Sequence, residues 1–392
     1  MPPIRTGVEV ALRSVLAPGL LAARWIGQQR ILGPDDPPSP RPSLSLAAKA
    51  VLDEIFFLTE VVSAQFVASG DLGRLAEEVA AALVVFEARG WLASPERYHV
   101  PPPPLVSPEL RPARTVGRDY AHLVFPSGYE PHLGEPGRER WHGYVPNRTA
   151  HAWLLRHPGR PRPWLVCIHG YRTGFPLADF VGFPAMWLHR ELGLNVVLPV
   201  LPLHGPRTVG WRSGDGVVSG AYVDTVHVQA QAVWDVRRLL HWIRAEGGER
   251  VGVYGVSLGG QTAALLAALE ADLDCVIAGM PAADSVHLAR WNVPGFVMAL
   301  AERLGIRWDH VEQLLRVISP LAMPPRVARE RRFLFGGLAD RLVPRDHMHA
   351  LWHHWERPRI GWYAGSHVSF LLEPAVRRFL RESLVTSGLV AG

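Results

Sequence analysis

Residues 250–271 read RVGVYGVSLGGQTAALLAALEA, and they carry the clearest structural signal in the chain. An apolar run that ends at Tyr254 is typical of a buried strand, and the residues from Leu258 onward favour a helix. Between them, Ser257 stands in a Gly-x-Ser-x-Gly motif where a strand would turn into a helix. Such a turn strains the serine backbone above the sheet, and the glycines remove side chains that would collide there. The motif predicts that Ser257 is a nucleophile, and the alternative is an ordinary helix cap.

Strands and helices alternate on both sides of this motif. Continuous apolar runs predict strands that are covered on both faces, and the intervening segments have helical periodicity. The predicted strands are 164–168, 195–200, 250–254, 275–279, 332–335 and 360–363, and the predicted helices are near 180–192, 226–245, 258–271, 348 and 374–384. This alternation predicts an α/β fold with a doubly wound, mostly parallel sheet.

The segment before residue 119 has a different pattern. Helical periodicity predicts three helices, over about 8–31, 46–66 and 72–86, and a Pro-rich stretch that follows predicts an extended linker. The second helix is apolar nearly all round, which predicts that it is buried. We therefore expect an N-terminal helical extension and linker over residues 1–118 and an α/β domain over residues 119–392.

Two further features belong to the α/β domain. Short runs at 121–125, 141–145 and 150–155 are bounded by Pro, Gly and Asn, so we expect three strands in an antiparallel part of the sheet. Residues from about 285 to 326 are mostly helical and fall between two predicted core strands. In an α/β sheet such a connection lies over the carboxyl ends of the strands, so we expect a helical cap insertion there.

A serine hydroxyl needs a base within hydrogen-bond reach to act as a nucleophile. His367 lies in a loop directly after the strand predicted over 360–363, whereas the histidines near residue 350 have a helical context. Asp340 follows the strand predicted over 332–335 and is placed to accept a hydrogen bond from His367. Asp346 is the alternative acid, although its place at a helix start suits a capping role. The candidate catalytic residues are therefore Ser257, His367 and Asp340.

An oxyanion hole would need two backbone N–H groups aimed at the developing negative charge. One candidate is the amide of Leu258, directly after the nucleophile. The other is the amide of Tyr171, in the loop that begins with His169-Gly170 after the strand over 164–168. We expect His169 and Gly170 to border the pocket.

A second loop, Leu203-His204-Gly205-Pro206-Arg207, also follows a strand end. His204 and Arg207 are candidates to border the pocket, where they would favour an anionic or polar acyl substrate. The alternative, which we favour slightly, is a loop tied by Arg–Asp pairs.

The order of these motifs, from His169-Gly170 through the serine pentapeptide and Asp340 to Gly365-Ser366-His367, resembles the α/β-hydrolase superfamily over about residues 119–384. The resemblance implies an eight-stranded sheet, an acyl-enzyme mechanism and no cofactor. The Gly-Ser-His-Val-Ser-Phe block and the long N-terminal extension are also similar to poorly characterised bacterial hydrolases related to alpha/beta-hydrolase domain-containing protein 18 of animals. The expected function is that of a serine esterase. Amide or peptide hydrolysis, acyl transfer and a non-catalytic binding role are the alternatives.

Composition narrows the class of partner. The chain has 392 residues, 48% hydrophobic, and a net charge of +5 without long runs of like charge, so nucleic-acid binding is disfavoured. Cys167 and Cys275 lie in apolar runs, and no metal-ligand spacing is present, which favours a cytoplasmic protein without a metal. We expect a small-molecule ester or acyl substrate as the partner. Packing of the N-terminal helices on the domain is favoured over peripheral membrane contact, and a homodimer is compatible with the sequence.

Overall fold

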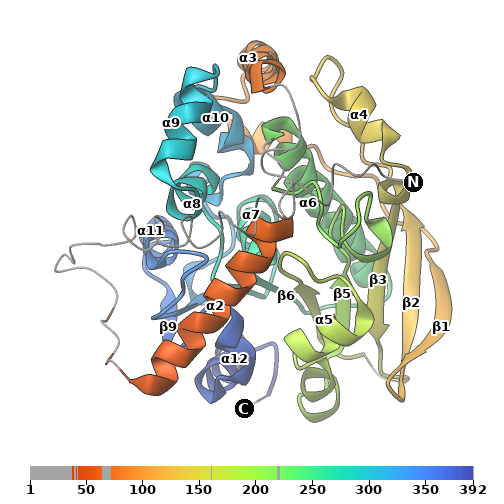
Figure 1. Ribbon diagram of the computed structural model, residues 1–392. Helices are drawn as coiled ribbons and strands as arrows, with labels where there is room; N and C mark the ends of the chain where they lie inside the picture. The colour runs from red at the N-terminus through yellow and green to blue at the C-terminus, as the bar shows by residue number, and fades with distance from the viewer. Residues whose placement is uncertain are drawn as a thin grey trace.

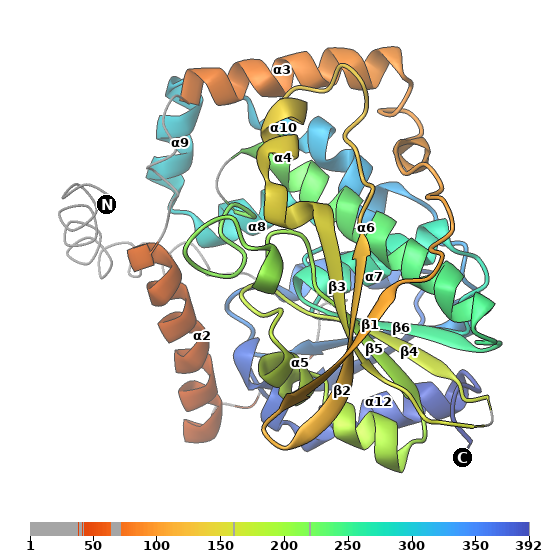
Figure 2. The same ribbon diagram turned by 90° about the vertical axis from the view of Figure 1, so that its right-hand side faces the viewer.

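The computed structural model describes residues 38, 41, 43–63, 72–159, 161–218 and 221–391. The helix predicted over residues 8–31 lies outside these ranges. The described elements form three layers, with the sheet in the middle and helices on both of its faces (Figures 1 and 2). Cys167 and Cys275 are free, buried thiols.

The sheet has nine strands in the order β1-β2-β3-β5-β4-β6-β7-β8-β9. The strands β5, β4, β6, β7, β8 and β9 run parallel to one another in that order, whereas β1 and β2, β2 and β3, and β3 and β5 pair antiparallel. The strands are β1 (Glu109–Thr115), β2 (Arg118–Pro126), β3 (Thr149–Leu155), β4 (Trp164–Ile168), β5 (Asn195–Pro199), β6 (Val251–Val256), β7 (Cys275–Gly279), β8 (Arg332–Gly337) and β9 (Arg359–Tyr363). This mostly parallel, doubly wound sheet confirms the predicted α/β-hydrolase fold.

Two hydrophobic cores cover the two faces of the sheet. Val166 and Ile168 of β4 contribute to one core, and Leu165 and Cys167 of the same strand contribute to the other. The first core contains residues of α6, α7 and α11, and the second contains residues of α5 and α12. The helices are α2 (Leu44–Ser63), α3 (Leu72–Ala88), α4 (Arg138–Gly143), α5 (Pro176–Gly182), α6 (Tyr222–Ala245), α7 (Leu258–Leu269), α8 (Ser285–Asn292), α9 (Gly295–Arg303), α10 (Trp308–Leu315), α11 (Arg345–His354) and α12 (Pro374–Thr386).

The antiparallel side of the sheet differs from the prediction in two places. Part of the Pro-rich linker forms β1, a ninth strand at the edge of the sheet, where a proline such as Pro112 is tolerated because an edge strand need not donate every N–H. The strand predicted over 141–145 is wrong, because this segment ends α4 and begins a short 3-10 turn at Val145. Its apolar signal comes from Trp141, which is buried and donates a hydrogen bond to Gln231 of α6 at 3.0 Å.

Helix α2 is not the buried helix that its apolar composition predicts. Val51 and Ile55 are each 53% exposed, whereas Asp53 and Glu54 are buried. In Figures 1 and 2, α2 lies on the outside of the molecule, against the domain. The face of α2 that packs against the domain therefore contains charged side chains.

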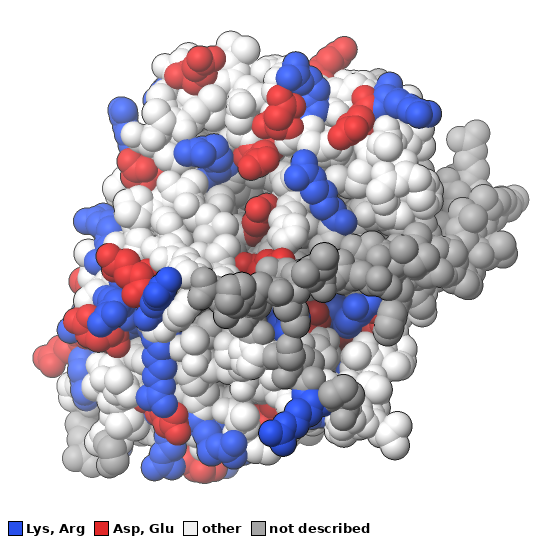
Figure 3. Space-filling view, turned by 90° about the vertical axis from the view of Figure 1, so that its left-hand side faces the viewer, with Lys and Arg blue, Asp and Glu red and all other residues white. Residues whose placement is uncertain are grey.

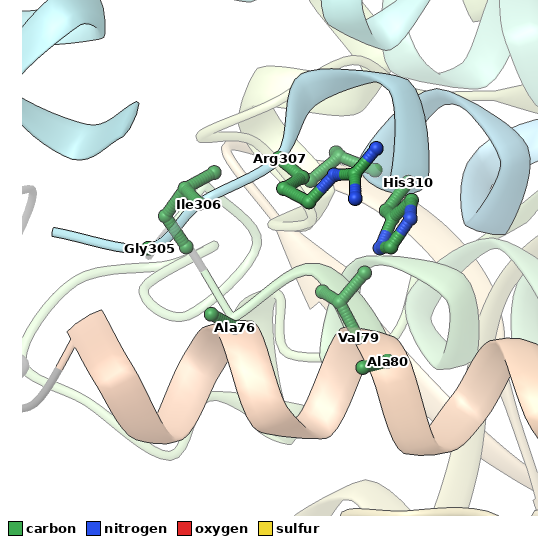
Figure 4. Close-up of a pocket in the computed structure, with 8 residues that line it drawn as sticks. Ala76, Val79, Ala80, Gly305, Ile306, Arg307 and His310 are labelled. Atoms are coloured by element: carbon green, nitrogen blue, oxygen red, sulfur yellow. The ribbon is translucent and has the colours of Figure 1, made fainter. Parts of the chain in front are cut away.

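The segment predicted as a cap contains α8, α9 and α10, and its role as a cap stays a prediction. Helix α10 packs against α3 and α6. A cavity of about 130 Å³ lies between α3 and the segment 305–311, lined by residues such as Ala76, Val79 and His310 (Figure 4). This cavity is separate from the residues predicted to be catalytic.

Charged side chains of both signs are interspersed over the face of the molecule that carries α9 and α11 (Figure 3). Within the described ranges, no helix combines the length and the apolar character that crossing a membrane requires.

Candidate active site

Ser257 lies in the tight turn between β6 and α7. Its backbone has φ 57° and ψ −117°, a strained conformation for a residue other than glycine. A side chain at Gly255 would collide with the backbone of Gly259, and one at Gly259 would collide with the carbonyl oxygen of Ile168. In this turn the Ser257 side chain makes no capping hydrogen bond to α7, which argues against the helix-cap alternative. The turn has the geometry of a nucleophile elbow.

Asp340 and His367 are brought together at the carboxyl ends of β8 and β9. His367 Nδ1–H donates a hydrogen bond to Asp340 Oδ2 at 2.7 Å. The other oxygen, Asp340 Oδ1, accepts the N–H groups of Leu342 at 2.9 Å and Val343 at 2.8 Å, so the carboxylate is fixed in orientation. Burial lowers the pKa of His367, but the charge of Asp340 and its hydrogen bond outweigh this effect and raise the pKa above its ordinary value.

The alternative acid, Asp346, lies in the first turn of α11. The sequence predicted this place at a helix start for Asp346. The Nδ1–H of His367 donates its hydrogen bond to Asp340, the residue predicted to accept it.

Backbone hydrogen bonds join the loop of Asp340 to the loop of His367, and they tie the turn of Ser257 to the end of the neighbouring strand β7. Ser257 N–H donates to Gly279 O at 2.8 Å, and Ala339 N–H donates to Gly365 O at 2.9 Å. The elbow, the acid loop and the histidine loop follow the carboxyl ends of β6, β8 and β9, which run parallel in the sheet, so they lie at the same end of the sheet. Within the described residues of these loops, no hydrogen bond joins Ser257 to His367. The hydrogen bond between a catalytic serine and its base is commonly long or poorly aligned until substrate binds.

The predicted oxyanion loop lies against the elbow. A Cβ built on Gly170 would stand 3.3 Å from Ser257 Cβ. His169 Nδ1–H donates to Gly170 O at 2.7 Å, and His169 Nε2 accepts the N–H of Leu201 at 3.0 Å, so both ring nitrogens are used to hold the loop. Burial lowers the pKa of His169, which keeps the ring neutral. Within the described part of the chain, the N–H groups of Tyr171 and Leu258 have no hydrogen-bond partner, as expected of oxyanion donors.

The prediction that His204 and Arg207 border the pocket is wrong. The side chains of His204 and Arg207 are both fully buried. Arg207 forms an ion pair with Asp235 at 2.9 Å and donates a hydrogen bond to Val200 O at 2.9 Å. His169 is also buried, so its side chain supports the loop instead of lining an opening. The alternative interpretation, a loop tied by Arg–Asp pairs, describes what the structure shows.

Replacing Arg207 by methionine is expected to lower the free energy of unfolding by about 3–5 kcal/mol, because it leaves Asp235 buried without its cation. The double variant Arg207→Met/Asp235→Asn should recover part of this loss, since it removes both charges. Urea unfolding followed by tryptophan fluorescence measures both variants. A loss below about 1 kcal/mol in the single variant would contradict a structural role for the pair.

Sequence reasoning missed the part that α2 plays at this site. Asp53 on α2 accepts hydrogen bonds from the N–H groups of Arg341 and His367, each at 2.9 Å. Seven residues further along the helix, Glu60 accepts a hydrogen bond from the guanidinium of Arg172 at 2.6 Å, beside the predicted oxyanion donor. One helix before the predicted α/β domain thus reaches both the loops of Asp340 and His367 and the loop of Tyr171 and Arg172.

A signal for this role was present in the sequence. Lys49, Asp53 and Glu60 are spaced by four and seven residues, so they share one face of a helix. Such a polar stripe on an otherwise apolar helix indicates specific polar partners, although it does not say which ones.

Among the residues that the structure describes, no group of three or more His, Cys, Asp or Glu side chains is arranged to hold a metal ion.

Two proteins of Mycobacterium tuberculosis are similar to almost the whole chain. The uncharacterized protein MT2702 of strain CDC 1551 / Oshkosh and the uncharacterized protein Rv2627c of strain H37Rv are each 41% identical over 403 residues, which covers 99% of this chain and 93% of theirs. The chain belongs to their family. No family model matches the sequence. The alignment with these two relatives covers 99% of the chain, which includes the loops of Ser257, Asp340 and His367 and helix α2.

Solved structures with a similar fold are more distant from this member of the family. Acetyl xylan esterase 1 from Thermoanaerobacterium sp. JW/SL YS485 is 17% identical with a TM-score of 0.48, covering 74% of this chain and 98% of the esterase. A puromycin-hydrolyzing peptidase of Mycobacterium tuberculosis is 16% identical with a TM-score of 0.44, covering 72% of this chain and 40% of the peptidase. These are likenesses of the fold.

Proposed function

We propose that this protein is a serine hydrolase that cleaves carboxylic esters through an acyl-enzyme intermediate. The observation that carries the proposal is the strained turn at Ser257, at the same end of the sheet as the 2.7 Å hydrogen bond between His367 and Asp340. The elbow presents the serine hydroxyl above the sheet, and an oriented histidine is the base that a serine hydroxyl needs to become a nucleophile.

In the proposed reaction, Ser257 Oγ attacks the ester carbonyl carbon while His367 Nε2 takes the hydroxyl proton. Asp340 holds the ring in the tautomer that leaves Nε2 free to accept, and it stabilises the imidazolium that forms. The N–H groups of Tyr171 and Leu258 stabilise the negative charge on the carbonyl oxygen. His367 then gives its proton to the leaving alcohol, and the acyl group remains on Ser257.

Water releases the acid by the same path in reverse. His367 takes a proton from water, the hydroxide attacks the acyl carbon, and Ser257 leaves with that proton restored. Ester hydrolysis is favoured over amide hydrolysis or acyl transfer because it requires the least beyond the triad. A transferase would also need a second pocket for an acceptor.

Labelling with a fluorophosphonate tests the proposal directly. An activated Ser257 Oγ attacks the phosphorus, fluoride leaves, and a stable adduct forms. We expect one adduct on the wild type, located on Ser257 by intact mass and peptide mapping. Ser257→Ala should give none, while the control Ser387→Ala, at a half-buried serine just after α12, should label fully.

Matched substrates then separate the reaction classes. Nitrophenyl esters and nitroanilides with the same acyl group compare ester with amide hydrolysis, and an added alcohol acceptor reveals acyl transfer. An unlabelled but folded wild-type protein would contradict the proposal and favour a binding role for the fold.

A further inference from the structure

Asp53 is a buried carboxylate that joins two loops of the candidate active site. Its side chain is 0% exposed, and both oxygens accept backbone hydrogen bonds. Oδ2 accepts the N–H groups of Arg341 and His367, and Oδ1 accepts the N–H of Val368, each at 2.9 Å. Arg341 follows Asp340 directly, so a single carboxylate holds the loop of the acid and the loop of the base.

These contacts act on the pair that must be positioned for catalysis. Asp53 binds the main chain of His367 itself and of the residue next to Asp340, so the distance between the ring and the acid depends on it. A displacement of about 1 Å in a catalytic group can cost about 100-fold in rate. Residues that hold reacting groups through backbone contacts therefore have large effects without touching the substrate.

Helix α2 has other polar contacts that dock it on the domain. Lys49 forms an ion pair with Glu373 at 2.6 Å and donates to Ala364 O at 3.0 Å, and Glu54 pairs with Arg341 at 2.8 Å. Placing a second buried carboxylate beside Asp340 is unfavourable, because burial and the charge of Asp340 both raise the pKa of Asp53. A buried carboxylate with this cost, on a helix that other contacts also dock, points to a role in the site itself.

We propose that Asp53 is a positioning residue of the hydrolase, which fixes the loops of Asp340 and His367 and adds a second negative charge beside the catalytic base. This inference rests on the proposed function. The structure thereby extends the catalytic machinery to a helix that lies outside the α/β domain predicted from the sequence.

The second charge has a consequence for pH dependence. Asp340 and Asp53 are the charged groups that raise the pKa of His367. The base must be neutral to take a proton, so kcat/KM falls as the pH drops through this raised pKa. Removing one negative charge lowers the pKa of His367 and moves the acid limb to lower pH. The neighbouring charges form pairs of their own: Lys49 with Glu373, and Arg341 with Glu54.

Asp53→Asn is the informative variant, because asparagine keeps the size of the side chain but loses its charge and one acceptor oxygen. We expect kcat to fall about 10- to 100-fold, with KM changed less than about threefold, and the acid limb to shift to lower pH. The matched control is Glu54→Gln on the same helix, which loses the ion pair with Arg341. Its acid limb should stay where it is in the wild type.

A second measurement does not depend on activity. Titration of ¹⁵N-histidine-labelled protein by NMR gives the pKa of His367, whose signals are identified by their loss in His367→Gln. A lower pKa in Asp53→Asn than in the wild type supports the inference, even if Ser257 proves unreactive and the proposed hydrolase activity fails. An unchanged pKa overturns it, even if esters are cleaved. Should Asp53→Asn unfold, Asp53→Ser offers the same comparison with a smaller side chain.

Discussion

Replacing His367 by alanine is expected to lower kcat for ester hydrolysis by about 10⁶-fold, as does Ser257→Ala. Without the base the serine hydroxyl keeps its proton, and without the serine the base has no nucleophile to activate. The two side chains act as a unit, so the double variant Ser257→Ala/His367→Ala should be no slower than either single variant. Initial rates on an activated ester measure all three.

A suitable control is His353→Ala, at an exposed histidine on α11, which should keep wild-type activity within about twofold. Losses that multiply in the double variant would show that Ser257 and His367 act independently, and would contradict the proposed triad.

Asp340→Asn is expected to lower kcat by about 10⁴-fold. The asparagine amide can donate a hydrogen bond to Nδ1, which stabilises the tautomer with its proton on Nε2, where the ring cannot accept a proton from Ser257. The loss of the Asp340 charge also lowers the pKa of His367, so the residual activity should extend to lower pH. A pH profile of kcat/KM for the variant and the wild type measures both effects.

Asp346→Asn provides the matched control, since this carboxylate is the alternative acid and lies in the first turn of α11. We expect its activity to stay within a few-fold of the wild type. Equal losses in the two variants would show that the acid has been assigned to the wrong residue.

The parallel part of the fold could be predicted because its strands are buried on both faces. Runs such as Trp164–Ile168 are apolar at every position and have few alternative structures open to them. The strand β1 escaped prediction because an edge strand needs neither a continuous apolar run nor every N–H, so Pro112 read as a linker residue. The segment 141–145 was wrongly predicted to be a strand, because the large side chain of Trp141 is buried and makes the segment look apolar.

The candidate site also has residues that the sequence could predict and residues that it could not. Ser257, Asp340 and His367 each follow a predicted strand, so the order of strands and loops was enough to select them. Asp53 follows no strand, and the polar stripe to which it belongs does not name its partner, because its hydrogen bond to His367 joins residues that are 314 positions apart. The burial of Arg207 could not be predicted either, because its partner Asp235 lies on a helix whose packing the sequence does not specify.

The pairing of α2 with the histidine loop also bears on how the protein is made. A ribosome releases α2 well before the loop of His367, because Asp53 and His367 are 314 positions apart, so the two partners of this contact emerge far apart in time. The free-energy cost of closing so long a loop grows slowly with its length, but long-range contacts form late in folding. The proposed hydrolytic activity should therefore appear only after the loop of His367 has left the ribosome, when the sheet has folded and the helix can dock on it. A nascent chain would carry the nucleophile for many seconds without a completed site to use it.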